Sequence, residues 1–290
     1  MPVASPPRSF ASIAGALAAL PGARLLDTRD ETAFARGHAE GAGRVSPEEF
    51  VTRRAELPSR ELPVLVVHDV PERAREAATA LAALGYSRVG WLERTLASEP
   101  EGHASVKTAS RLWSPGEFIE REASRARSLR IDRGAGPGLA LDLACGSGRA
   151  AVYLSLTGWN TAGWDVDPSA LERARALAQR HGVAVAFAAV DLERAVPADA
   201  KAPFDLIVVV RFLHRPLFPW IERALAPGGL LLYETFRDGQ QLYGHPRRSR
   251  FLLRNRELLT AFPSLLVEQH EETPDGAPPL LARLVARKPG

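Results

Sequence analysis

A predicted strand that runs directly into closely spaced glycines constrains this chain more than any other feature. Residues 139–145 read LALDLAC, and the glycines of the following GSG precede a helical pattern over 148–158. Glycine tolerates positive φ and lets a ligand approach the backbone, so this turn suits a nucleotide-like ligand. Ala151 stands where a dinucleotide-binding motif has its third glycine. A tight turn without any ligand is the alternative while the motif is considered alone.

Acidic residues close the next two predicted strands. Asp165 ends the strand over 160–166, and Asp191 ends the strand over 184–192. A carboxylate at the first position can accept hydrogen bonds from both hydroxyls of a ribose. Asp191 can accept from an adenine amino group while the backbone N–H of Leu192 meets a ring nitrogen. Three acids in register, counting Asp142, favour a ligand over an empty turn.

The fold class follows from two series of alternating strands and helices. Strands are predicted over 23–28, 62–69 and 88–93, with helices between them, and a second series begins at Leu139. The last two predicted strands, EQHEE and LLARLVARK, can pair as a hairpin. We therefore expect two α/β domains, a small parallel one over 1–100 and a Rossmann-like one over 111–290, joined by a linker over 101–110.

The second domain resembles the class I S-adenosylmethionine-dependent methyltransferases. DLACGSGR, WDVDPSAL, AVDLER and FDLIVVV followed by LAPGGLLLYE match successive motifs of that family. The resemblance implies a seven-stranded sheet and S-adenosyl-L-methionine as cofactor. It implies these cofactor-binding residues: Asp142, Ala144, Cys145, Gly146, Ser147, Gly148, Arg149, Asp165, Val166, Asp191, Leu192 and Arg211.

The single cysteine, Cys145, excludes a disulfide framework within the chain and a cysteine-rich zinc site. With no histidine near it in sequence, we expect a small filler of the loop rather than a nucleophile. No metal-binding cluster is visible, and no apolar run reaches the ~20 residues that span a bilayer. These features predict a soluble, cytoplasmic protein without a metal, and the net charge of +3 does not by itself indicate a nucleic-acid partner.

Methyl transfer requires an aligned acceptor, and the acceptor side should follow the strand over 204–212. Arg211 and His214 are the catalytic candidates there, although His214 could instead orient backbone at a helix start. An arginine run over 243–258 is either a solvated face or a lid that collects anions. The predicted substrate-binding residues are Tyr243, Arg247, Arg250, Arg254 and His270.

Within its class, the domain looks like the tellurite-resistance-type methyltransferases and their small-molecule relatives, which are associated with tellurite, selenium compounds and thiols. His270 is followed by Glu271 and Glu272 where basic residues are expected, which leaves a small polar or soft nucleophile as acceptor. Two alternatives stay open. One is an RNA methyltransferase that uses the arginines of 247–256, and the other is a non-catalytic cofactor-binding protein.

The first domain resembles rhodanese domains over residues 8–98. LLDTRDETAFARGHAEGA matches their first signature, and AATALAALGYSRVGWLE matches a later helix and strand. In that family a cysteine follows the central strand, whereas here the strand ends at His68 and Asp69. We therefore expect no sulfur transfer. The domain is predicted to act as a scaffold, as a pairing surface between protomers, or as an anion-binding module that uses Arg73 and Arg75.

Overall fold

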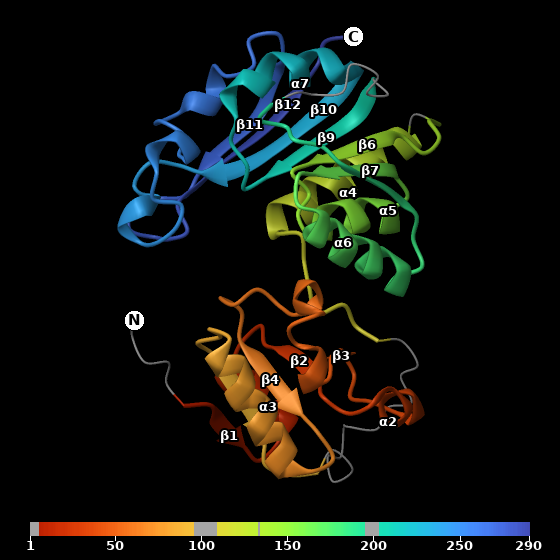
Figure 1. Ribbon diagram of the computed structural model, residues 1–290, viewed down its shortest axis with the longest axis vertical. Helices are drawn as coiled ribbons and strands as arrows, with labels where there is room; N and C mark the ends of the chain where they lie inside the picture. Colours follow the sequence, from red (N-terminus) through yellow and green to blue (C-terminus); the bar gives the residue numbers. More distant parts are fainter. Residues whose placement is uncertain (1–5, 96–108, 133, 195–202) are drawn as a thin grey trace. The chain divides into compact units, whose positions relative to one another are not determined.

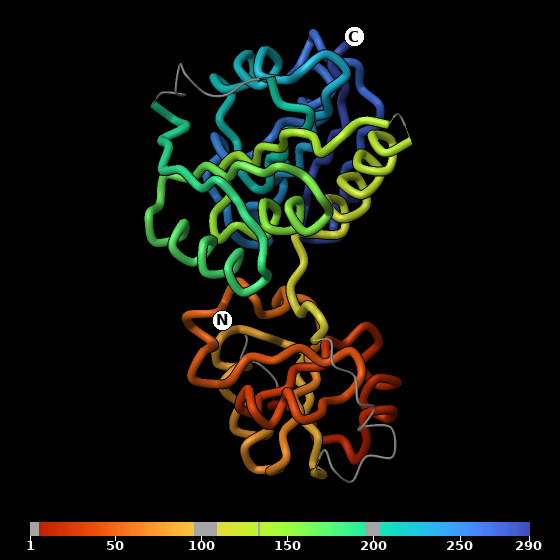
Figure 2. Tube along the Cα trace, turned by 90° about the vertical axis from the view of Figure 1, so that its right-hand side faces the viewer, coloured from red at the N-terminus to blue at the C-terminus, as the bar shows by residue number. Residues whose placement is uncertain are grey.

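The computed structural model describes residues 6–95, 109–132, 134–194 and 203–290. The chain divides into two units, Met1–Ser114 and Pro115–Gly290, each with its own sheet (Figures 1 and 2). Residues 101–108 of the expected linker lie outside the described residues. The N–H of Ser110 donates to the Ala42 carbonyl at 2.9 Å, and Leu112 is buried in the core of the first unit. The second unit therefore begins at Pro115 rather than at residue 111.

The N-terminal unit is built on a parallel sheet of five strands in the order β1-β5-β4-β2-β3. Its central strand β4 alternates between two cores. Val64 and Val66 pack toward helix α3, while Leu65 and Val67 pack in the cluster that contains Ile13 of α1. The elements are β1 (Arg8–Phe10), α1 (Ile13–Ala19), β2 (Arg24–Asp27), α2 (Glu31–Arg36), β3 (Ala42–Arg44), β4 (Val64–Val67), α3 (Pro71–Ala83) and β5 (Val89–Leu92).

The C-terminal unit is built on a seven-stranded sheet in the order β11-β12-β10-β9-β6-β7-β8. Strands β6 to β10 are parallel, and β12 runs antiparallel to both β10 and β11, which forms the expected terminal hairpin. The elements are α4 (Glu117–Asp132), β6 (Leu139–Leu143), α5 (Arg149–Leu156), β7 (Asn160–Asp165), α6 (Pro168–Arg180), β8 (Val185–Ala189), β9 (Phe204–Val210), α7 (Phe218–Ala224), β10 (Leu225–Phe236), β11 (Leu266–Glu272) and β12 (Leu281–Arg287).

Helices cover both faces of this sheet. Figure 1 shows α4, α5 and α6 on one face and α7 on the other. The side chains of β6 alternate accordingly, because Ala140 packs with Phe118 of α4 while Leu141 packs with Phe218 of α7. Strands buried on both faces explain why β6 and β9 read as continuous apolar runs. Their carboxyl ends, where parallel strands place ligands, therefore meet at one edge.

The turns at that edge are formed by local sequence. The side chain of Asp167 caps α6 by accepting the Ser169 N–H at 2.9 Å, and Pro168 occupies the first helical position. Helix α5 instead begins at Gly148, whose φ of 78° lies in the left-handed region. A Cβ at Gly148 would lie 2.7 Å from that of Ala174, so only glycine fits there. None of the helices in the described parts of the chain has both the length and the apolar composition needed to cross a membrane.

Candidate active site

The glycine loop and the acid of the neighbouring strand are brought together. The carboxylate of Asp165 accepts the N–H of Gly146 at 2.7 Å and the N–H of Asp167 at 2.9 Å. Gly146 has a φ of 52°, and a Cβ added there would meet nothing within 4 Å. The backbone of the loop is thus open to a ligand at Gly146 and fixed to β7 from behind. Val166 follows Asp165 with 60% of its surface exposed, so its side chain is available to a ligand beside the loop.

Asp142 lies beneath this loop rather than in it. Only 2% of its surface is exposed, and its carboxylate accepts the N–H of Ala151 in the first turn of α5 at 2.9 Å. Burial raises the pKa of Asp142 to about 7, while the hydrogen bond from Ala151 opposes that shift. Asp142 therefore positions the helix that ends the loop. A direct contact between Asp142 and a cofactor has no support in this geometry.

Cys145 fills the floor of the loop, as the sequence predicts. Its side chain is buried, and its N–H donates to the carbonyl of Trp164 at 2.9 Å. Burial raises the pKa of the thiol, and the nearby carboxylates of Asp142 and Asp165 raise it further. A thiol held neutral in this way is a poor nucleophile.

Two non-glycine residues at adjacent strand ends have left-handed backbone. Ala144 follows β6 with a φ of 55°, and Arg211 follows β9 with a φ of 56°. The strands are neighbours, with Leu143 paired to Val209. Each such conformation costs of order 1 kcal/mol and concentrates at functional sites. The N–H of Arg211 donates to the carbonyl of Glu234 at 2.7 Å, which fixes this turn to β10.

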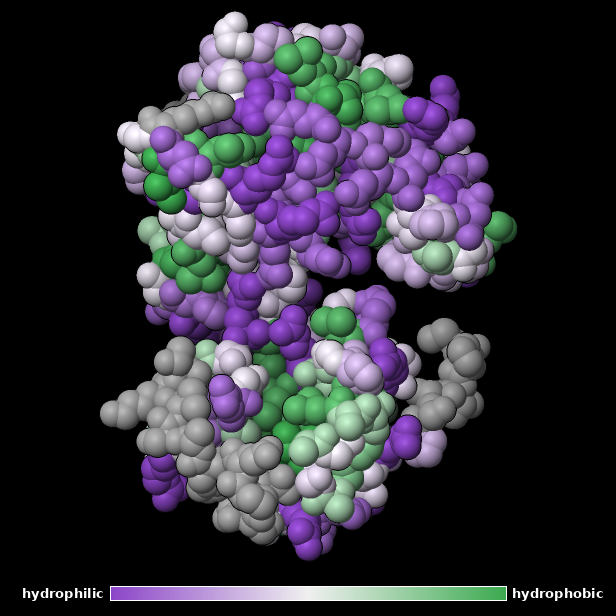
Figure 3. All heavy atoms as spheres, turned by 180° about the vertical axis from the view of Figure 1, so that it is seen from behind, coloured by the Kyte–Doolittle hydropathy of each residue, from purple (hydrophilic) through white to green (hydrophobic). Residues whose placement is uncertain are grey.

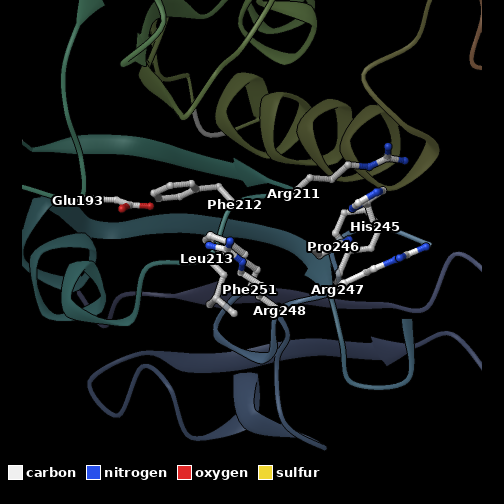
Figure 4. Close-up of a pocket in the computed structure, with 10 residues that line it drawn as sticks. Glu193, Arg211, Phe212, Leu213, His245, Pro246, Arg247, Arg248 and Phe251 are labelled. Atoms are coloured by element: carbon white, nitrogen blue, oxygen red, sulfur yellow. The ribbon is translucent and has the colours of Figure 1, made fainter. Parts of the chain in front are cut away.

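A cavity of about 760 Å³ opens beside Arg211 (Figure 4). Its walls come from the segments that follow β8, β9 and β10. They combine aromatic rings, arginines, a histidine and one carboxylate. The residues around it are Glu193, Arg211, Phe212, Leu213, Phe236, His245, Pro246, Arg247, Arg248 and Phe251.

One arginine attaches the far wall of the cavity to the sheet. Arg215 donates to the carboxylate of Glu257 at 2.5 and 2.7 Å and to the carbonyl of Leu252 at 3.0 Å. The N–H of Leu253 donates to the carbonyl of Phe236 at 2.9 Å, which joins the same segment to the end of β10. Burial opposes ionisation of Glu257, yet the hydrogen bonds from Arg215 and from the Arg254 N–H lower its pKa. The wall is therefore held by charged hydrogen bonds that persist at neutral pH.

The residues predicted to be catalytic or to bind the substrate fall into two groups. Arg211 and Arg247 line the cavity. His214 does not; it precedes the short helical turn at Arg215–Leu217, where its carbonyl accepts the Leu217 N–H at 3.0 Å and its side chain makes no capping hydrogen bond. Tyr243, Arg250 and Arg254 also lie outside the lining, and His270 lies on β11 with its Nε2 3.5 Å from the carboxylate of Glu272.

Most of the aromatic residues that line the cavity, and its one carboxylate, were not predicted from the sequence. Phe212 and Leu213 directly follow Arg211, so the strand end carried a signal for them. Glu193 likewise follows Leu192, which was predicted at the cofactor. His245 had no sequence signal, because its place depends on Gln240, whose amide donates to the His245 carbonyl at 3.3 Å and whose buried oxygen accepts the Leu280 N–H at 2.8 Å.

Comparison with known families agrees with this geometry. Residues 140–229 match the family model of a methyltransferase domain, and residues 12–96 match that of a rhodanese-like domain. The chain joins a rhodanese-like domain to a class I methyltransferase domain. In the methyltransferase domain, no group of three or more described His, Cys, Asp or Glu side chains is arranged to hold a metal ion.

Curated relatives match part of this chain. The ribosomal protein L11 methyltransferase of Thermus thermophilus is 42% identical over 94 residues, which are 32% of this chain and 36% of that protein. The same-named protein of Dechloromonas aromatica is 36% identical over 119 residues, 40% of this chain and 34% of that protein. The chain thus spans about a third of the length of these relatives.

Among solved structures, the N-methyltransferase NodS of Bradyrhizobium japonicum in complex with S-adenosyl-L-homocysteine is 22% identical. It matches with a TM-score of 0.46 over 61% of this chain and 90% of its own. At such a score the likeness says nothing about the acceptor of this methyltransferase domain.

The corresponding edge of the rhodanese-like domain is closed by its own side chains. Arg29 donates to the buried carboxylate of Asp27 at 2.7 Å and reaches Asp69, after β4, at 3.3 Å. The N–H of Val70 donates to the ring of His68 at 2.9 Å, and α3 begins at Pro71. Asp69 and His68 thus stand where the family has a reactive cysteine, and the turn before α3 is occupied by their contacts.

Proposed function

We propose that the methyltransferase domain transfers a methyl group from S-adenosylmethionine to a small molecule bound in the cavity beside Arg211. The observation that carries this proposal is the position of the cavity. It lies at the carboxyl ends of β9 and β10, beside Arg211, and β9 pairs with β6, the strand that leads into Ala144 and the glycine loop. A cofactor on the loop and an acceptor in the cavity would therefore meet at Arg211.

The residues at the loop fit such a cofactor. The open backbone at Gly146 would receive its methionine part, and the carboxylate of Asp165 would accept from the ribose hydroxyls. The exposed Val166 would pack against the adenine, with Asp191 and the Leu192 N–H at its polar edge. When bound, the cofactor supplies the methyl group as an electrophile and carries its own leaving group. The chain has to align the acceptor and keep water out.

For an acceptor that must lose a proton, the cavity contains one carboxylate among its described residues, Glu193. His214 lies outside the lining, and Figure 4 shows Glu193 at the opposite end of the cavity from Arg211, so we propose neither as the base at the reacting atoms. We retain Arg211 as the residue that contacts both ligands.

A second candidate acceptor is a protein. The relatives that match part of this chain are named ribosomal protein L11 methyltransferases, although the match covers about a third of them. Methylation of purified L11 protein by this chain, with no turnover on small molecules, would favour that candidate.

We propose that the rhodanese-like domain is a scaffold. Figure 3 shows apolar side chains gathered on one face of this domain. Helix α1 exposes Leu17 at 41% of its surface, and Ala14 and Ala18 beside it are also exposed. Such a face suits packing against protein, including a second copy of the chain, better than it suits an anion.

The experiment that tests the methyltransferase proposal is calorimetric titration of the whole chain with S-adenosylmethionine and S-adenosylhomocysteine. Turnover assays with small thiols, selenite and tellurite follow. We expect micromolar binding and a methylated product. Binding without turnover on any acceptor favours a cofactor sensor, salt-dependent binding of RNA favours the RNA alternative, and absence of cofactor binding contradicts the proposal.

A further inference from the structure

The cavity has a marked excess of positive charge. Arg211, Arg247 and Arg248 line it together with His245, against the single carboxylate of Glu193. Figure 4 shows Arg211, His245 and Arg247 grouped at one end in this view and Glu193 at the other. A ligand that fills this space would therefore meet guanidinium groups at one end.

The charges of these arginines are not neutralised by the chain. Among the described residues, none forms an ion pair with Arg211, Arg247 or Arg248. Other arginines of the domain do have acidic partners, as Arg215 has in Glu257 and Arg283 has in Glu234 at 2.7 Å. Guanidinium groups left without carboxylates beside a cavity are suited to binding an oxyanion in a bidentate manner.

The rest of the wall is aromatic. Phe212, Phe236 and Phe251 each lose part of their surface to the fold and line the same cavity. The guanidinium carbon of Arg211 lies 5.5 Å from the centre of the Phe236 ring, which holds that arginine at the boundary between the apolar and charged parts. The cavity thus offers flat apolar surface next to cationic donors.

From this arrangement we infer that the acceptor is an aromatic molecule that carries an anionic group, a carboxylate or a phosphate monoester, and that Arg247, at the end of the cavity that it shares with Arg211 and His245, binds this group. The inference rests on the proposed function for its description of the ligand as a methyl acceptor. Binding of the anion is a property of the cavity alone and can be measured separately. Arg211 is not used as a test residue because it adjoins the cofactor.

The test is calorimetric titration of the whole chain with phenylacetate, phenyl phosphate and the neutral phenylacetamide, with and without S-adenosylhomocysteine. We expect at least one of the two anions to bind at least about tenfold more tightly than the amide. Arg247→Gln should weaken anion binding by about tenfold and leave the amide unchanged. The matched control is Arg254→Gln, which removes the same charge from an exposed arginine outside the cavity and should change binding less than about twofold.

Each result of this titration either supports or overturns the inferred anion site. A preference for phenyl phosphate over phenylacetate, or the reverse, identifies the anionic group. Equal binding of the amide and the anions, no binding of either anion, or an equal effect of Arg254→Gln overturns the inference. S-adenosylhomocysteine binding reports on the proposed function independently, because it should survive in Arg247→Gln whether or not the anions bind.

Discussion

The two domains end their central parallel strands in opposite ways. In the methyltransferase domain, β6 leads into Ala144 and Gly146, whose backbone is held at positive φ and left open to a ligand. In the rhodanese-like domain, β4 leads into His68 and Asp69, which are used by the Val70 N–H and by Arg29. The shared architecture fixes where a site can form. Whether the turn leaves donors and volume free, or fills them with its own side chains, decides whether a ligand can bind.

The largest effect is expected from removing the Arg29–Asp27 ion pair at the strand ends of the rhodanese-like domain. Arg29→Met leaves Asp27 fully buried without its cation, which costs about 3–5 kcal/mol in the free energy of unfolding. Hydrogen exchange on the whole chain should show the loss within the rhodanese-like domain alone. Arg36→Met, on the exposed side of α2, is the control and should have little effect. A cofactor affinity that fell in step with Arg29→Met would contradict the independence of the two edges.

A somewhat smaller effect is expected at the open edge. Asp165→Ala removes the acceptor of the Gly146 and Asp167 N–H groups together with the proposed partner of the ribose. Titration should show S-adenosylmethionine binding at least about 100-fold weaker, since charged hydrogen bonds contribute about 1.5–3 kcal/mol each. Asp69→Ala removes the strand-end acid of the other domain and should leave this affinity within about twofold. Similar losses in both variants would remove the distinction between the edges.

The third prediction concerns pH. The folded pKa of Asp142 is about 7 and its ordinary value is 3.8, so the native state binds more protons between these values. Stability supplied by the protonated side chain is therefore lost as pH rises from about 4 to about 7, by at most about 4 kcal/mol. Asp142→Asn keeps an oxygen for the Ala151 N–H and cannot ionise. The melting temperature of Asp142→Asn minus that of the parent chain should therefore increase from about pH 5 to about pH 8.

For this comparison, Asp238→Asn serves as a control at an exposed carboxylate. A difference between Asp142→Asn and the parent chain that stays constant with pH would show that Asp142 ionises in the native state as it does in the unfolded chain.

For the last variant we expect no sulfur-transfer activity. Asp69→Cys restores a thiol where rhodanese domains have one. We still expect no thiocyanate from thiosulfate and cyanide above the background of the parent chain. The reason is that the Val70 N–H is taken by His68 and that Pro71, where α3 begins, has no N–H, so neither residue offers a free donor to the sulfur. Measurable thiocyanate would show that the cysteine was the only missing part.

The strands and helices of both domains were predictable because their sequences carry strong periods. The predicted strands over 62–69 and 204–212 contain the apolar runs VLVV and LIVVV, and the acids at 165 and 191 mark strand ends. Strands β1 and β3 were missed, since three residues are too few to show a period of two. The segment 110–113 was assigned to the linker and the second domain, because nothing local reveals that Leu112 enters the core of the first unit.

The candidate site also has one part that the sequence predicts and another that only the structure shows. The sequence by itself located the glycine loop, the strand ends that carry Asp165 and Asp191, and the structural role of Cys145, because these residues lie at the ends of predicted strands. Only the tertiary structure decided the rest. It separated Arg247 and Arg248 from Arg250 and Arg254, which look equivalent in sequence, and it moved Asp142 beneath the loop. The physical reason is that the cavity is assembled from contacts between distant segments, such as Arg215 with Glu257 and Gln240 with Leu280, and no local pattern encodes them.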